Sequence, residues 1–155
     1  MSYRVIGLDP AEFSHLFNLP DAALAAQGAR RHVVDAKPGF PDRIGLRDME
    51  IGETALLLNY THQPADTPYR ASHAIFVAEG AGQAADLIGE VPDVMRIRTM
   101  SLRAFNEEGE MLDADLAADD EIEPLILRLF AKPEVAYLHA HYAKRGCYAA
   151  RVDRA

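Results

Sequence analysis

Short runs of apolar residues, most of them alternating with polar ones, follow one another along most of the chain. This pattern is typical of β-strands, because successive side chains of a strand point to opposite faces of a sheet. The run at 55–58 is apolar throughout, which indicates a central strand covered on both faces. The predicted strands cover residues 31–36, 43–46, 54–60, 72–78, 94–105 and 110–113, and two more within 134–154 that are joined by a turn at 144–146.

Helical periodicity is clear in only one place. After Asp119 and Asp120, apolar residues recur at helical spacing and predict one buried helix face: Ile122, Leu125, Ile126, Leu129 and Phe130. Residues 9–17 and 21–27 predict two short helices, the first begun by Asp9-Pro10 and the second ended by Gly28. We therefore predict one α+β domain spanning 1–155, with a mostly antiparallel sheet of about six or seven strands and helices packed on one side.

Composition and charge argue against several classes of function for this protein. The chain has 155 residues, 49% of them hydrophobic, which is enough for one compact core without disulfides or metals. Its net charge of −8 argues against nucleic acid or an anionic membrane as a partner, since both require a basic surface. A single cysteine forms no internal disulfide, no apolar run is long enough to cross a bilayer, and Asp9 comes too early for a signal-peptide core. The expected location is the cytoplasm.

The chemistry-bearing residues gather in two stretches. His139 and His141 alternate on one predicted strand, so both imidazoles face the same way. The polar segment 61–72 joins two strong strands and adds a phenol and a guanidinium, groups suited to binding carboxylates or phosphates. We expect a pocket for a small polar or anionic metabolite, with these candidate ligand-binding residues: Tyr60, Tyr69, Arg70, His73, His139, His141, Cys147 and Arg151.

Several alternatives stay open. A divalent metal bound by His139, His141 and His73, with His62 as another third ligand, would make the protein a metal-dependent enzyme. Cys147 beside the two histidines is a candidate nucleophile. A non-enzymatic interaction module, for instance a homodimer formed through the tyrosine-rich C-terminal strands, is the third alternative. Neither a cofactor nor a reaction is specified by any motif.

Four stretches, in order along the chain, carry a resemblance to a known family. They are Lys37-Pro38-Gly39-Phe40-Pro41, the segments 52–60 and 68–77, and Tyr137-Leu138-His139-Ala140-His141 with the segment 146–152. Together they resemble the bacterial family catalogued as domain of unknown function 1203. The resemblance implies one compact domain and transfers no mechanism, because that family label has no assigned reaction.

Overall fold

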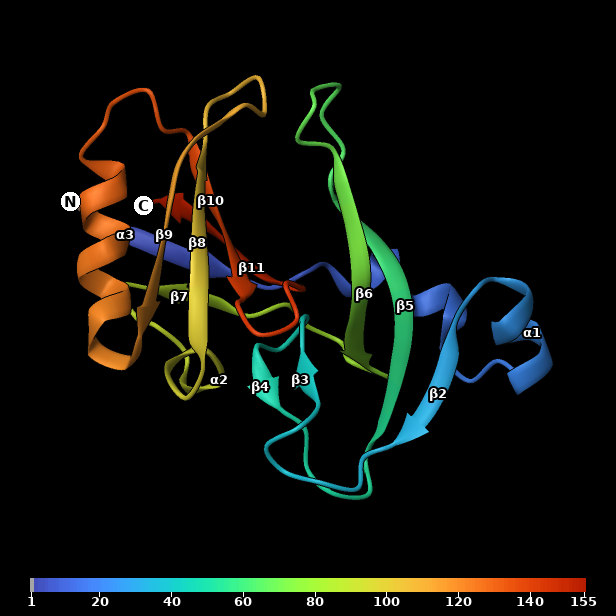
Figure 1. Cartoon of the computed structure of the whole chain (residues 1–155). Helices are drawn as coiled ribbons and strands as arrows, with labels where there is room; N and C mark the ends of the chain where they lie inside the picture. The colour runs from blue at the N-terminus through green and yellow to red at the C-terminus, as the bar shows by residue number, and fades with distance from the viewer. Residues whose placement is uncertain (1) are drawn as a thin grey trace.

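The computed structural model describes residues 2–155, and antiparallel strands dominate it (Figure 1). They form three sheets rather than the single sheet expected, so that part of the prediction is wrong. The large sheet has the order β7 (Asp86–Ile88), β1 (Tyr3–Ile6), β11 (Tyr148–Arg154), β10 (Tyr137–Tyr142), β8 (Thr99–Phe105) and β9 (Met111–Ala118). The small sheet has the order β2 (Arg30–Val33), β5 (Thr54–Gln63) and β6 (Ala71–Ala78), and β3 (Pro41–Asp42) pairs with β4 (Arg47–Asp48).

The helices cover different sheets, which also departs from the prediction that all lie on one side. α3 (Ile122–Phe130), entered through the 3-10 helix η3 (Asp119–Glu121), packs its predicted apolar face on the large sheet (Figure 1). The N-terminal helices η1 (Pro10–Glu12), η2 (Ser14–Leu16) and α1 (Asp21–Ala26) pack instead on the small sheet. The coarse prediction, an α+β fold of mostly antiparallel strands, is confirmed.

Two strands were not predicted from the sequence, and two local predictions are wrong, each for an identifiable reason. Residues 3–6 and 86–88 form β1 and β7, because each finds a partner strand far away in sequence. The predicted strand 94–105 begins instead with α2 (Asp93–Arg96), which buries Val94 and Met95 after the extended Pro92. The short strand predicted at 43–46 is a turn between β3 and β4, held by the Asp42 carboxylate, which accepts hydrogen bonds from the amides of Ile44 and Gly45.

The large sheet has one apolar face and one polar face. Leu102, Ala140 and Val152 belong to the core under α3. On the opposite face, His139 lies between its cross-strand partners Arg103 on β8 and Arg151 on β11. This polar face is turned toward the small sheet, so the two sheets enclose charged and imidazole side chains between them.

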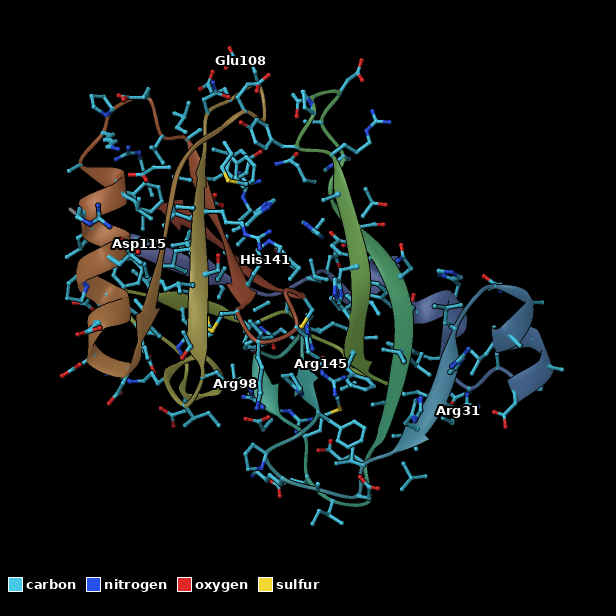
Figure 2. The ribbon with its side chains drawn as sticks, viewed as in Figure 1. Arg31, Arg98, Glu108, Asp115, His141 and Arg145 are labelled. Carbon is cyan, nitrogen blue, oxygen red and sulfur yellow. The ribbon has the colours of Figure 1, made fainter. Side chains whose placement is uncertain are left out.

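The two sheets also touch at their tips. The Gln63 amide donates to the Tyr137 hydroxyl at 3.0 Å, and the Thr67 hydroxyl donates to the Gly109 carbonyl at 3.2 Å. The second contact joins the 64–70 loop to the β8–β9 turn, whose tip is marked by Glu108 in Figure 2. No helix within residues 2–155 has the length and apolar character needed to cross a membrane.

Candidate functional site

A cluster of three histidines lies between the two sheets. His139 and His141 come from β10 and face the same way, as predicted, and His62 comes from the end of β5 in the small sheet. The ring centroid of His62 is 4.7 Å from that of His141 and 6.1 Å from that of His139, and the two β10 rings are 6.3 Å apart. Figure 2 shows His141 between the strands of the two sheets. We call these three residues the histidine cluster.

Each ring of the histidine cluster has one buried nitrogen without a hydrogen-bond partner: His62 Nδ1, His139 Nδ1 and His141 Nε2. The side chains are at most 9% exposed, and buried polar atoms in proteins are nearly always hydrogen bonded. His141 Nδ1 lies 2.9 Å from the Gly146 carbonyl, which only accepts, so Nδ1 must hold the proton. In the neutral ring Nε2 is therefore a free acceptor.

All three imidazoles are neutral at physiological pH. Burial, followed by the charge of Arg103, lowers the pKa of His62 to about 4. Burial, followed by the neighbouring histidines and Arg151, lowers the pKa of His139 to about 3. Burial also lowers the pKa of His141 to about 3, although the hydrogen bond to the Gly146 carbonyl acts to raise it. Neutral imidazoles are both hydrogen-bonding groups and potential bases.

Tyr148 holds the histidine cluster together. Its ring stacks on His62 with an interplanar angle of 11° and meets His139 and His141 edge-on. Tyr148 is buried in the same apolar core as the small-sheet residue Leu58, so one aromatic ring anchors imidazoles from both sheets. Packing against Tyr148 thus helps to orient all three rings, and the bond from His141 Nδ1 to the Gly146 carbonyl adds a polar contact for one of them.

A pocket of about 410 Å³ opens beside the histidine cluster. Its walls come from the segment after β1, the end of β5, and strands β10 and β11. The residues that line the pocket include Arg151, Asp9 and Glu12, together with His62 and His139. Burial and the nearby Asp9 raise the pKa of Glu12. This mixture of one cation, two acids and two neutral imidazoles suits a small polar ligand rather than an apolar one.

The structure brings together only some of the residues proposed from sequence. Tyr60, His139 and Arg151 line the pocket, and His141 lies next to it in the histidine cluster. His73 is the cross-strand partner of Tyr60, but its Nδ1 donates to the Ala74 carbonyl and it does not line the pocket.

Tyr69 and Arg70 are not brought to the pocket. Both are exposed in the loop between β5 and β6, where Arg70 lies 3.6 Å from the Asp66 carboxylate. Their loop instead reaches the β8–β9 turn, as the Thr67 contact shows. Sequence proximity to β5 and β6 therefore did not place these two side chains at the pocket.

Cys147 belongs to a different environment. Its side chain is buried in the core under α3, and its sulfur accepts a hydrogen bond from the fully buried guanidinium of Arg43 at 3.1 Å. The other Arg43 donors bind the carbonyls of Tyr148 and Pro41. Cys147 is therefore not part of the pocket wall, and this arrangement favours a packing role over the nucleophile hypothesis.

Three residues near the site were missed by the sequence reasoning. Asp9 and Glu12 were assigned only to a helix start, and Asp9 does cap η1 by accepting from the Ala11 amide. Arg103 was placed on a strand without a role, yet it is the β8 neighbour of His139. A sequence signal existed only for Arg103, which alternates with apolar residues on its strand; the positions of the two acids depend on tertiary contacts.

Within residues 2–155, no group of three or more His, Cys, Asp or Glu side chains has the arrangement of a metal site. The charged groups that act on the pKa values of the rings in the histidine cluster are arginines and other histidines, and no carboxylate is among them. Around the rings themselves this positive charge favours an anionic group over a bare divalent cation, while the acids Asp9 and Glu12 belong to the same pocket wall.

Comparison with known proteins shows a family match. No curated protein and no solved structure matches the chain. The family model described as "Protein of unknown function (DUF1203)" matches residues 39–154, a range that contains all three members of the histidine cluster. Because this match covers most of the chain, the protein belongs to the DUF1203 family.

Proposed function

We propose that this protein binds a small polar or anionic metabolite in the pocket beside the histidine cluster. The observation that supports this most directly is the set of three buried ring nitrogens without a protein partner. Leaving buried polar atoms unpaired costs about 1–3 kcal/mol each, so a cluster of three is stabilised by a molecule that bonds to them. Tyr60 and Arg151 supply further polar contacts from the pocket wall.

Two structural features support the proposal that the ligand is a small molecule. The pocket volume of about 410 Å³ is at the lower end of the range for small-molecule sites. The tips of the two sheets are joined by the Gln63–Tyr137 and Thr67–Gly109 contacts, which limit how far the sheets separate. A small metabolite fits these limits better than a polymer does.

Native mass spectrometry of the purified protein, followed by denaturing extraction, tests the proposal. We expect wild-type protein to retain a small-molecule mass or to gain one from a bacterial metabolite extract. The double variant His139→Gln and His141→Gln should lose it, because glutamine keeps polarity but displaces the ring nitrogens. His15→Gln, at an exposed position in η2, is the matched control and should behave as wild type.

Retention of the same mass by the double variant would contradict the proposal. Circular dichroism must show that the variant is folded; if it is unfolded, the two histidines are structural and the proposal loses its support. The native mass spectra also report the oligomeric state of the protein. A homodimer that retains no ligand would favour the interaction-module alternative.

The metal-dependent alternative has one specific observation in its favour. The Nδ1–H of His141 donates to a backbone carbonyl and leaves Nε2 free, which is the arrangement that orients metal-binding histidines. Elemental analysis of the same wild-type preparation distinguishes the two proposals. Near-stoichiometric zinc, iron or manganese that is lost in the double variant would favour the metal site; absence of metal together with a retained organic mass favours the metabolite pocket.

A further inference from the structure

Arg103 is a half-buried cation without an acidic partner. It lies on β8 with its Cα opposite that of His139, and its Nε donates only to the Ser101 hydroxyl of its own strand at 3.3 Å. Among residues 2–155, no carboxylate forms an ion pair with it. The terminal nitrogens of the guanidinium are therefore available to another group.

The other arginines that are not exposed have polar partners within residues 2–155, in a chain with 24 acidic residues against 16 lysines and arginines. Arg31 pairs with Glu79, and Arg98 pairs with Asp48 through two bonds of 2.9 and 2.7 Å. Burial lowers the pKa of Arg103, and no carboxylate offsets that effect. A partly desolvated charge without an ionic partner costs free energy, which makes this arginine a candidate for ligand binding.

The charge of Arg103 reaches the whole histidine cluster. After burial, it contributes to the lowered pKa of His62, His139 and His141 alike. On the other side of His139, Arg151 is already engaged, since its Nε donates to the Asp153 carboxylate at 2.7 Å and its guanidinium lies 4.1 Å over the Tyr137 ring. Of the two arginines that flank His139, Arg151 lines the pocket and is paired with a carboxylate, whereas Arg103 is not a pocket-lining residue and has no carboxylate partner among residues 2–155.

We infer that Arg103 binds the anionic group of the ligand, a carboxylate or a phosphate, and that the histidine cluster contacts the remainder. The inference rests on the proposed function and narrows its ligand class. A planar guanidinium forms two parallel hydrogen bonds with either anion. His141 Nε2 is an acceptor in the neutral ring, so the same ligand is expected to carry a hydroxyl or amine hydrogen that it donates there.

Two probes separate the sources of such an anion: inorganic phosphate and glycolate, a small hydroxycarboxylate. Binding to ligand-free full-length protein is measured by isothermal titration calorimetry at constant ionic strength. We expect at least one probe to bind wild type, with Kd raised about tenfold or more in Arg103→Gln because charge-assisted bonds are lost. Arg103→Lys keeps the charge without the planar fork and should fall between the two.

The control is Arg128→Gln on α3, an exposed arginine paired with Asp115, which should bind the probes as wild type does. Imidazole NMR resonances of His139 and His141 should shift when the probe is added to wild type and not to Arg103→Gln. If the glutamine variant does not fold, the lysine variant decides alone, and a Kd within about twofold of wild type overturns the inference.

Failure of this inference is distinguishable from failure of the proposed function. If neither probe binds wild type, or if both Arg103 variants bind as wild type does, the inference is wrong. A metabolite that is lost in the histidine double variant but kept by Arg103→Gln would overturn the inference and leave the proposed function standing. Probe binding that depends on Arg103 and persists in the histidine double variant would support the anion site and contradict the role given to the histidines.

Discussion

At the scale of single residues, the histidine cluster combines two properties that are seldom found together. Its imidazoles are almost fully buried, and each keeps one ring nitrogen without a partner. Packing against Tyr148 explains how the rings are held, but it satisfies none of those nitrogens. The cluster therefore lowers the stability of the fold relative to apolar side chains that would fill the same space. Such a loss of stability is expected at a binding site.

The lowered pKa values predict a stability that falls in acid. Each folded-state pKa, about 4 for His62 and about 3 for His139 and His141, lies below the ordinary value of about 6.5 for an unfolded chain. As pH falls through 6.5, the unfolded chain takes up protons that the folded chain does not, so the free energy of unfolding decreases. Between pH 7 and pH 5 the loss is up to about 2 kcal/mol for each histidine.

Urea denaturation at pH 7.5, 6.5, 5.5 and 5.0 measures this slope. The double variant His139→Gln and His141→Gln should show a shallower decrease than wild type, whereas His15→Gln serves as the control outside the cluster. A wild-type stability that does not change across this range would contradict the lowered pKa values, because it would mean that the folded protein takes up as many protons as the unfolded chain.

At the scale of elements, the site depends on two sheets approaching each other, and their tips provide a local test. Gly109 in the β8–β9 turn has φ +82°, a conformation that favours glycine, and a Cβ there would lie 2.4 Å from the Cβ of Ala65 in the β5–β6 loop. The contact is thus made possible by the absence of a side chain at this one position.

We predict that Gly109→Ala destabilises the protein by more than Gly80→Ala does. Gly80 has a similar φ of +86° but no atom within 4 Å of the added Cβ, so it carries the same backbone strain without the clash. The strain costs about 1 kcal/mol in both variants, and overpacking adds about 1–3 kcal/mol at Gly109 alone. Thermal or urea unfolding measures both variants; equal losses would mean that the tips are not held in contact.

At the scale of the whole molecule, two apolar cores are joined by shared elements. Val152 of β11 belongs to the core under α3, and Tyr148 of the same strand belongs to the core of the small sheet. The buried Arg43 adds a second connection, because its guanidinium bonds to the backbone carbonyls of Tyr148 and of Pro41 in β3. The pocket lies where these connected parts meet.

We therefore predict that the chain unfolds in one transition, as a single domain does. Ile126→Ala in the core under α3 and Leu56→Ala in the small-sheet core should each cost about 2–5 kcal/mol, and each should shift the same transition. Far-ultraviolet and near-ultraviolet circular dichroism follow the backbone and the tyrosines during urea unfolding. Two separated transitions, each moved by only one variant, would contradict the prediction and show that the sheets fold independently.

The sequence by itself determined the features that depend only on residues close together along the chain. The spacing of Ile122, Ile126 and Leu129 predicted α3, and alternation along β10 predicted that His139 and His141 share a face; both are confirmed. The C-terminal hairpin and the antiparallel character of the fold followed from the same local periodicities.

Only the tertiary structure decided which residues meet across the sheets. The strands divide into separate sheets, and this division brings His62 from β5 to the two β10 histidines in place of His73. It also places Arg103 beside His139 and the acids of the N-terminal segment in the pocket wall. Alternation specifies which side of a strand a residue occupies but not which strand lies opposite, because that choice depends on long-range pairing and on how two cores pack together.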